Sequence, residues 1–315
     1  MKKAIVILLI AIIILLVAAC DMVNLSGGTG GEGDGTVSWA GIRFSSYGMR
    51  QSYGKDNFPN ETKTTSLVKK MSSYYDDSAG TVILIVGPIS SNKDKSGNVV
   101  SGNCSLEFPL SKEIEYAYGD DEDAYDSYLT AFDKAGYSVW LQVEPGDADL
   151  VELATEVMSH YGPKHRCVKG FGIDVEWYKY RYDKAKDRET SSKLTDDVAR
   201  KVVQAVRKIN SNYTVFVKHW DERWLPSSYR DGLIFVSDSQ IYESIDAMRD
   251  DFAGWAAHYA PSPVMFQIGY NADKWFWSEL GNPAKDLGSY IAEGCTSGNK
   301  LGIIWVDFTL KEVLN

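Results

Sequence analysis

Short runs of consecutive apolar residues recur along the chain from about residue 40 to its end, separated by longer polar or amphipathic stretches. The runs are rich in Val, Ile and aromatic residues, a composition that predicts β-strands. Eight strands are predicted in this way, at residues 40–44, 81–86, 137–143, 168–175, 213–217, 233–236, 264–268 and 301–306.

Several of the intervening stretches repeat apolar residues at helical spacing, notably 121–135, 148–161 and 195–209, and Thr195 precedes the last of these as an N-cap. Strands that alternate with helices imply a parallel sheet, and eight repeats imply closure into a single (β/α)8 TIM barrel over residues 37–315. An open doubly wound sheet is the alternative, because periodicity does not distinguish a closed sheet from an open one.

The N-terminus has a different pattern. Two lysines precede a run of 16 apolar residues, 4–19, which is short for a membrane-spanning helix and typical of a secretory signal peptide. Val17-Ala18-Ala19-Cys20 resembles the bacterial lipoprotein box, which implies cleavage after residue 19 and lipidation of Cys20. A retained N-terminal anchor is the alternative. Both place the rest of the chain outside the cytoplasm. The lipoprotein interpretation places it in a bacterial cell envelope, with the lipid as its only membrane contact.

Residues 20–36 contain six glycines and are expected to form a flexible linker between the lipid and the barrel. With Cys20 lipidated, three cysteines remain, so at most one disulfide and one free thiol are expected. These are Cys104, Cys167 and Cys295.

Composition narrows the function classes. The 315 residues carry 33 Lys and Arg against 43 Asp and Glu, and this net charge of −10 argues against nucleic acid and against electrostatic docking on anionic lipid. Aromatic residues make up 12% of the chain. Neither a Gly-rich phosphate loop nor a Gly-x-Ser-x-Gly nucleophile motif occurs.

Acids gather where the predicted strands end, which is where the chemistry of a TIM barrel lies. The fourth strand ends in Asp174-Val175-Glu176, and strand alternation places both carboxyl groups on one face, toward the barrel mouth. Two acids so close together should not both ionise, and a protonated Glu beside an ionised Asp suits general-acid cleavage of a glycosidic bond. The alternative is an acid pair tied to Lys218 or Arg43, or simply solvated.

Aromatic residues also follow the strand ends, and flat side chains of this kind stack on sugar rings. Together with nearby polar groups they form the predicted substrate-binding set. Its members are Glu144, Trp177, Tyr178, Trp220, Gln267, Trp275, Trp305 and Asp307.

On these residues the chain resembles the chitinase-type barrels of glycoside hydrolase family 18, over most of residues 137–308. The family motif D-x-x-D-x-D-x-E ends in the catalytic Glu, and Glu176 and Asp174 match its last two acids, whereas Lys169 and Gly172 stand at the first two. Trp305 resembles the strand-eight Trp of that family. Gln240-Ile241-Tyr242-Glu243 resembles its strand-six motif only loosely.

A weaker resemblance is to the family 25 lysozymes, which also carry a strand-four Asp-x-Glu. Phe266-Gln267 and Val306-Asp307 are similar to motifs on their last two strands. Their strand-one Asp would fall near Arg43, so that acid is missing here.

These observations predict an extracytoplasmic, lipid-anchored glycoside hydrolase that cleaves an N-acetylhexosamine-containing glycan, chitin-like or peptidoglycan, without a cofactor. Glu176 is the expected acid, Asp174 orients an N-acetyl group or stabilises the cation, and Tyr242 or Tyr270 supports the intermediate. Gln267 and Tyr270 on the seventh strand, in place of a second Glu, favour substrate assistance.

Two other functions remain open. A non-catalytic glycan-binding lipoprotein on the same barrel would explain the missing acids at 169 and 172. A metal-dependent hydrolase could use Asp174, Glu176, His219 and Asp221 with Mg²⁺ or Ca²⁺, but four His residues without a zinc motif argue against zinc. No metal is therefore assigned.

Overall fold

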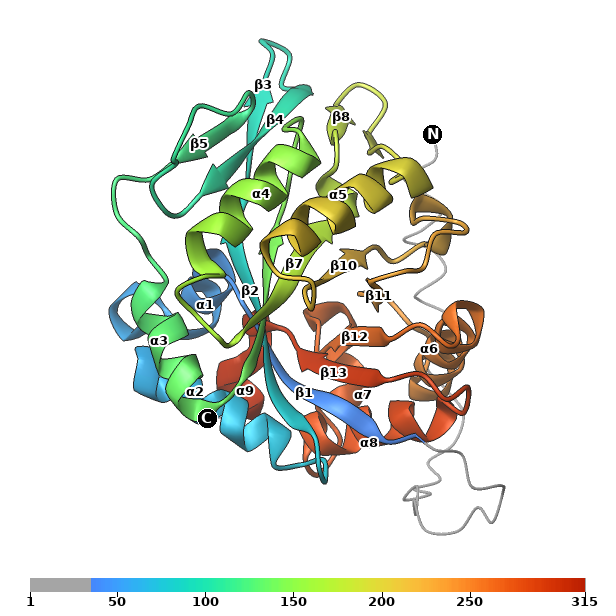
Figure 1. Ribbon diagram of the computed structural model, residues 1–315. Coiled ribbons are helices and arrows are strands. Elements are labelled where there is room, and N and C mark those ends of the chain that lie inside the picture. The colour runs from blue at the N-terminus through green and yellow to red at the C-terminus, as the bar shows by residue number, and fades with distance from the viewer. Residues whose placement is uncertain (1–34, 315) are drawn as a thin grey trace. The chain divides into compact units, whose positions relative to one another are not determined.

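Eight parallel strands close into a barrel in the computed structural model, which describes residues 35–314 (Figure 1). The first and last strands pair in parallel, with Ala40 opposite Ile303 and Ile42 opposite Trp305, so the sheet has no open edge. The barrel strands are β1 (Val37–Phe44), β2 (Ala79–Gly87), β6 (Ser138–Val143), β7 (Val168–Asp174), β10 (Thr214–Lys218), β11 (Leu233–Ser237), β12 (Val264–Ile268) and β13 (Leu301–Trp305).

The predicted fold class is confirmed: the chain forms a single (β/α)8 barrel rather than an open sheet. Each of the eight apolar runs corresponds to one barrel strand. Strands of a parallel barrel are buried on both faces, and for that reason they are visible in the sequence as continuous apolar runs.

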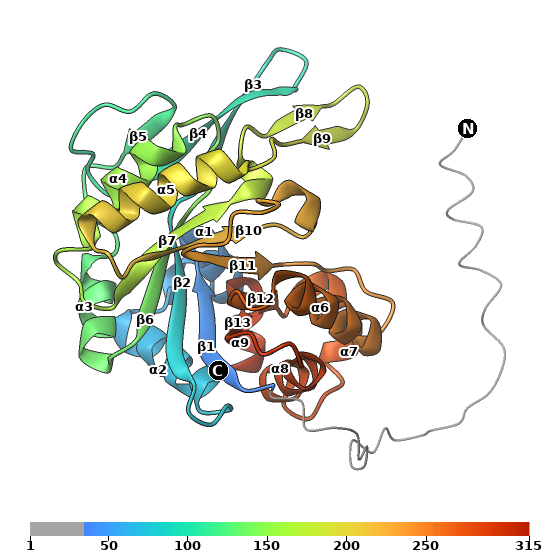
Figure 2. The same ribbon diagram turned by 45° about the vertical axis from the view of Figure 1, so that its right-hand side comes forward.

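Helices cover the outside of the barrel (Figures 1 and 2). The predicted helices correspond to α3, α4 and α5, and Thr195 caps α5 by accepting a hydrogen bond from the Val198 N–H. The fifth strand, β10, is followed in the described chain only by a 3-10 turn, Glu222–Trp224. The helices are α1 (Ser46–Tyr53), α2 (Glu61–Ser72), α3 (Asp126–Ala135), α4 (Leu150–Tyr161), α5 (Asp196–Ile209), α6 (Ile245–Tyr259), α7 (Lys274–Trp277), α8 (Pro283–Gly294) and α9 (Leu310–Val313).

A separate apolar cluster fills the inside of the barrel. Phe216 projects from β10 over Gly172 on the neighbouring β7, where an added Cβ would lie 2.1 Å from the Phe216 Cζ. Position 172 is therefore limited to glycine by packing. The cluster consists of Ile83, Trp140, Phe216, Ile234, Val236, Met265 and Ile304.

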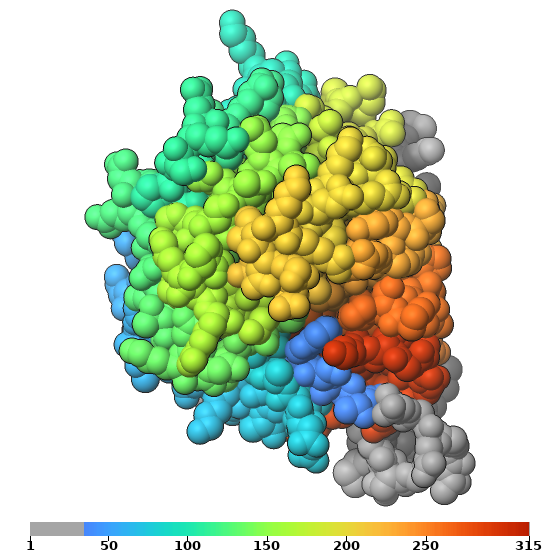
Figure 3. Space-filling model, in the orientation of Figure 1, coloured from blue at the N-terminus to red at the C-terminus, as the bar shows by residue number. Residues whose placement is uncertain are grey.

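Two insertions at the carboxyl end of the barrel were not predicted. The first follows β2 and the second follows β7, and they join where Val99 of β4 pairs with Tyr182 of β8. Together they form a small sheet that projects beyond the barrel, at the top of Figures 1 to 3. Its strands are β3 (Ile89–Lys93), β4 (Val99–Leu106), β5 (Ala117–Gly119), β8 (Arg181–Asp183) and β9 (Arg188–Thr190).

Some predictions concern residues that lie outside the described part of the chain. These are the signal peptide at 1–19, the lipidated Cys20 and most of the linker at 20–36. Within residues 35–314, none of the helices has the length and apolar character needed to cross a membrane. The three remaining cysteines, Cys104, Cys167 and Cys295, are all buried free thiols.

A buried ion pair joins the two strands that close the barrel. Asp307, just after β13, accepts hydrogen bonds at Oδ1 from Arg43 Nε at 2.9 Å and Nη2 at 2.6 Å. Its Oδ2 accepts from the backbone N–H of Ser45 at 2.6 Å and from the Ser45 hydroxyl at 2.5 Å. Arg43 and Asp307 are almost completely buried, so this contact ties the first strand to the last at the mouth.

We expect Asp307→Ala to lower the free energy of unfolding, measured by urea denaturation, by about 3–5 kcal/mol, because it leaves the Arg43 guanidinium buried without its counter-charge. The matched control is Glu152→Ala, which removes an exposed ion pair with Lys112 and should change stability by less than about 1 kcal/mol. Equal effects of the two substitutions would contradict this role of Asp307.

Candidate active site

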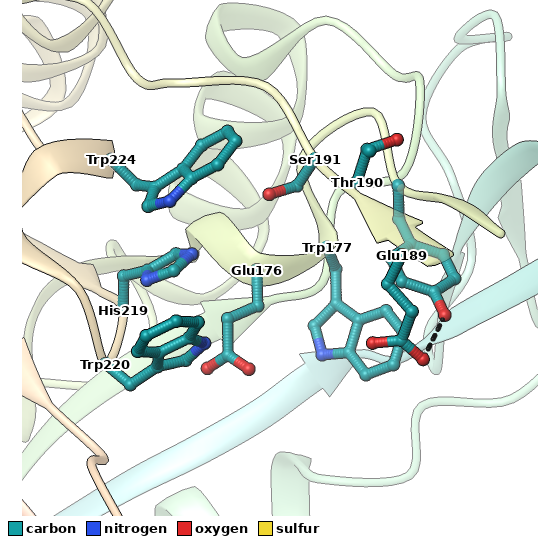
Figure 4. A pocket seen from close by; sticks show the side chains of 9 residues that line it. Glu176, Trp177, Glu189, Thr190, Ser191, His219, Trp220 and Trp224 are labelled. Carbon is teal, nitrogen blue, oxygen red and sulfur yellow. Dashed lines mark hydrogen bonds between the residues drawn. The ribbon is translucent and has the colours of Figure 1, made fainter. Parts of the chain in front are cut away.

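A pocket opens at the carboxyl end of the barrel, beside the fourth and fifth strands. Its walls come from the 3-10 turn Val175–Trp177 after β7, from the β8–β9 hairpin and from the segment after β10 (Figure 4). The cavity measures about 200 Å³. It is lined by Glu176, Trp177, Tyr180, Glu189, Thr190, Ser191, His219, Trp220 and Trp224.

The structure brings the two predicted acids of the fourth strand together. β7 ends at Asp174, and Glu176 lies one residue into the 3-10 turn rather than in the strand itself. Both carboxylates still contact the same ammonium group: Lys218 Nζ is 3.0 Å from Asp174 Oδ2 and 2.9 Å from Glu176 Oε1. Asp174 is buried, whereas the Glu176 side chain remains 29% exposed at the pocket.

Lys218, the last residue of β10, has a third carboxylate partner in Asp238, which directly follows β11. Three ammonium protons thus meet three carboxyl groups in a nearly solvent-free position. Burial alone would lower the pKa of Lys218, but the negative charges of Asp174, Asp238 and Glu176 outweigh it and raise that pKa well above its usual value. Lys218 therefore stays charged and cannot serve as a nucleophilic amine.

One positive charge does not balance three negative ones, so the cluster retains a proton. The Glu176 and Asp238 carboxyl groups are hydrogen-bonded to each other, which requires a proton on one of them. Burial and the Asp238 charge raise the pKa of Glu176 well above its usual range. Burial would also raise the pKa of Asp238, but Lys218 outweighs this and lowers it. The proton accordingly belongs to Glu176.

Asp174 differs from both Glu176 and Asp238 in its pKa. Burial raises its pKa to about 7, against the opposing effect of Lys218. Gln142 Nε2 donates a hydrogen bond to Asp174 Oδ2 at 3.2 Å, which holds the carboxyl group from the third barrel strand. Asp174 does not line the pocket, so its influence on a ligand passes through Lys218 and Glu176.

Three further predicted residues lie buried in the same barrel mouth. Glu144 accepts hydrogen bonds from the Tyr47 hydroxyl at 2.7 Å and from the Ile89 N–H at 2.8 Å, and burial raises its pKa. Tyr270 donates to Gln267 Oε1 at 3.2 Å. These contacts position Glu144, Gln267 and Tyr270 as the inner wall of the mouth, outside the pocket lining.

The other predicted residues are dispersed. Trp177 and Trp220 line the pocket, and Trp220 is 54% exposed. Trp275 is exposed on α7, which follows β12, and Tyr178 faces a different groove beside α4. Tyr242 donates its hydroxyl proton to Asp251 of α6 at 2.5 Å, outside the pocket lining.

Trp305 and Asp307 are fully buried. The Trp305 indole packs over Gly269, where a Cβ would lie 2.2 Å from its ring, and its Nε1 donates to the Thr309 hydroxyl at 2.8 Å. Asp307 is fully engaged with Arg43 and Ser45. Both residues therefore contribute to the core beneath the mouth.

His219 and Trp224 also form part of the pocket wall; the sequence points to Trp224 as one of the strand-end aromatics and to His219 only as a candidate metal ligand. Their rings stack at 5.6 Å with an interplanar angle of 13°. His219 Nδ1 accepts the Asp221 N–H at 2.9 Å, so the proton of the neutral ring lies on Nε2. Burial lowers the pKa of His219 to about 4, which makes it a neutral hydrogen-bond donor at physiological pH.

The structure also explains the two acids missing from the family 18 motif. Lys169 is exposed near the start of β7, where its Nζ donates to the Arg166 carbonyl at 2.9 Å, far along the strand from the mouth. Gly172 lies under Phe216 and has no room for a side chain. An apolar ring thus occupies the barrel interior where the motif would place an acid.

The donor set does not suit a divalent cation. The Lys218 ammonium group lies between Asp174, Glu176 and Asp238, and Arg223 holds Asp221 through both of its carboxylate oxygens. Within residues 35–314, no group of three or more His, Cys, Asp or Glu side chains has an arrangement that could bind a metal. A divalent cation placed among these three carboxylates would be repelled by Lys218.

Comparisons with known proteins yield partial structural similarity only. No family model and no curated protein matches the chain. A solved structure described as an alpha-L-fucosidase from Bacteroides thetaiotaomicron is similar at TM-score 0.49 and 12% identity, over 92% of this chain and 91% of that one.

Two further similar structures are an endo-1,4-beta-mannanase from Eisenia fetida and a broad-specificity endoglucanase from an uncultured bacterium. The mannanase has TM-score 0.45 and 10% identity, with 89% and 90% of the two chains covered. The endoglucanase has TM-score 0.42 and 11% identity, with 85% and 86% covered. Similarity at this level transfers neither activity nor substrate, and the resemblance to families 18 and 25 stays a prediction.

The charge balance around Lys218 can be tested by titration. Lys218→Met removes the one charge that lowers the pKa of Asp174, so we expect the midpoint to rise from about 7 by roughly one to three units. The measurement is carboxyl carbon NMR, started at acid pH, where the acids are neutral. Lys274→Met, at an exposed ion pair with Glu312, is the control and should leave the midpoint unchanged. An unchanged or lower midpoint in Lys218→Met would contradict the arrangement.

Proposed function

We propose that this protein hydrolyses a glycosidic bond, with Glu176 as the general acid. One observation carries the proposal. Glu176, the acid of the Lys218 cluster whose pKa is raised well above its usual range, is also the acid of that cluster that lines a pocket with aromatic walls. A general acid needs a proton at neutral pH and access to the leaving oxygen, and Glu176 combines both.

The walls of the pocket support a sugar as the ligand. Trp177, Trp220 and Trp224 present flat faces on which the C–H faces of a sugar ring can stack, while Ser191, Thr190 and the His219 Nε2–H offer hydrogen bonds to hydroxyl groups. No lysine or arginine is among the residues that line the pocket, so uronic acids and sulfated sugars are poor candidates.

The reaction that fits these residues is substrate-assisted cleavage of an N-acetylhexosamine linkage. The acetamido oxygen attacks the anomeric carbon, the bond to the leaving oxygen breaks, and Glu176 transfers its proton to that oxygen. Water then attacks the same carbon, the bond from that carbon to the acetamido oxygen breaks, and the proton lost by the water returns to Glu176. Asp238 and Lys218 are positioning residues here, since they hold the carboxyl group and set its protonation without lining the pocket.

We further propose that the protein works in the bacterial cell envelope, attached through lipid on Cys20. Support for this comes from the sequence of residues 1–36 alone, namely the apolar run, the box that ends in Cys20 and the Gly-rich linker. We propose a chitin-like polymer or peptidoglycan as the substrate, because a protein at that location meets extracellular and cell-wall glycans.

A non-catalytic glycan-binding protein is the second candidate. The observation in its favour is that Glu176 Oε1 is held at 2.9 Å by a fully charged Lys218, which restrains the carboxyl group in its place. Cleavage assays separate the two functions.

We expect Glu176→Gln to reduce cleavage of N-acetylglucosamine oligomers or peptidoglycan fragments by at least about 100-fold while leaving binding within a few-fold, because the amide keeps the shape but carries no transferable proton. Products are followed by mass spectrometry and binding by titration calorimetry. Glu279→Gln, an exposed acid near the same end of the barrel, should cleave like wild type. If neither wild type nor variant cleaves these substrates, the hydrolase proposal is wrong and the binding function stands.

Asp238→Asn should change the pH profile. The Asp238 charge raises the pKa of Glu176, so its removal lowers that pKa and moves the alkaline limb of kcat/KM to lower pH. A purely structural role for Asp238 would reduce the rate equally at all pH values. An alkaline limb that stays in place or moves upward would show that Asp238 does not control the proton.

A further inference from the structure

The pocket that exposes Glu176 contains a second carboxylate. Glu189 of β9, in the hairpin inserted after β7, lines the same cavity, and in Figure 4 Trp177 lies between the two carboxylates in the view shown. Because the hairpin is not part of the barrel, Glu189 is independent of the Lys218 cluster.

Glu189 brings uncompensated negative charge to the pocket. Its Oε1 accepts a hydrogen bond from the Tyr180 hydroxyl at 2.9 Å, drawn as the dashed line in Figure 4. The Glu189 side chain is exposed at the rim of the pocket, and within residues 35–314 it forms no salt bridge with a lysine, arginine or histidine. The one imidazole in the lining, His219, is neutral at physiological pH.

The rings around this carboxylate suit a positively charged group. Trp177 packs against Tyr180 with ring centroids 4.9 Å apart, and Trp220 and Trp224 form the opposite wall. Aromatic faces combined with a carboxylate attract ammonium groups, with each favourable cation–π contact contributing roughly 0.5–2 kcal/mol. A neutral sugar would gain the stacking but not the charge interaction.

We propose that the sugar unit held beside Glu189 carries a free, protonated amine, so that the protein selects partly deacetylated amino-sugar chains over fully acetylated ones. This inference rests on the proposed function, which supplies an N-acetylated unit at the scissile bond, and adds a glucosamine-type unit next to it.

The test compares two probes on the full chain carrying Glu176→Gln, which removes turnover. One probe is a trimer of glucosamine and the other a trimer of N-acetylglucosamine, each titrated by calorimetry at a pH at which the amines are protonated. We expect the glucosamine trimer to bind at least about tenfold more tightly, which corresponds to 1.4 kcal/mol. The preference should shrink as ionic strength rises.

Glu189→Gln, added to the same background, should abolish the preference while N-acetylglucosamine binding stays within a few-fold. Glu222→Gln, an exposed acid after β10 that does not line the pocket, is the matched control and should retain the preference. Equal binding of the two trimers, or a preference that survives Glu189→Gln, would overturn the inference. Tetramethylammonium that binds as tightly as the glucosamine trimer would overturn the assignment to a sugar.

Failure of the inference and failure of the proposed function give different results. Cleavage by wild type without any preference in binding removes only the amino-sugar selectivity. An amine preference in binding without any cleavage by wild type removes only the hydrolase activity, and the pocket is then a receptor for cationic glycans.

Discussion

The buried ammonium group of Lys218 determines the state of the whole barrel mouth. Its three carboxylate partners come from the ends of β7 and β11 and from the turn after β7, so a single side chain joins three segments and offsets only one of three potential negative charges. The surplus must be neutralised by protons, and the contact with Asp238 places one of them on Glu176. A carboxyl group that is protonated at neutral pH and accessible from a pocket is thus a consequence of charge balance in a place with little water.

The barrel and its insertions make separate contributions to this site. The barrel positions the groups that determine the protonation of Glu176. Asp174 and Lys218 end their strands and Asp238 directly follows β11, and these strands are positioned by the closed sheet and by an apolar interior packed around Phe216. The small sheet formed after β2 and β7 supplies the remaining wall through its β8–β9 hairpin. In the proposed function, chemistry and ligand selection are therefore carried by different parts of the chain, and Glu189 lies outside the Lys218 cluster.

The barrel could be predicted from the sequence because strands buried on both faces are continuous apolar runs, and all eight were identified. The inserted strands could not, since a segment such as Ile89–Lys93 is largely exposed and has no apolar period. In the site, Glu176 and Asp174 were identified because they lie at the end of a predicted strand. Asp238, the first residue after β11, lies at a strand end as well and could have been identified by the same criterion. Lys218 was also named as a possible partner of these two acids, and the structure shows that pairing. The additional contact of Lys218 with Asp238, which links Asp238 to Glu176, is long-range and has no local sequence signal. Trp305 was expected at the rim, but Gly269 leaves room for its indole in the core.

The most direct test of this account is the protonation state of Glu176 at neutral pH in the ligand-free protein. Infrared difference spectroscopy of wild type against Glu176→Gln detects the carbonyl band of a protonated carboxyl group separately from carboxylate bands. The account predicts that the wild-type spectrum at pH 7 contains a protonated-carboxyl band that Glu176→Gln loses. Loss of carboxylate bands alone would mean that Glu176 is ionised, and it would contradict both the shared proton and the role of Glu176 as an acid.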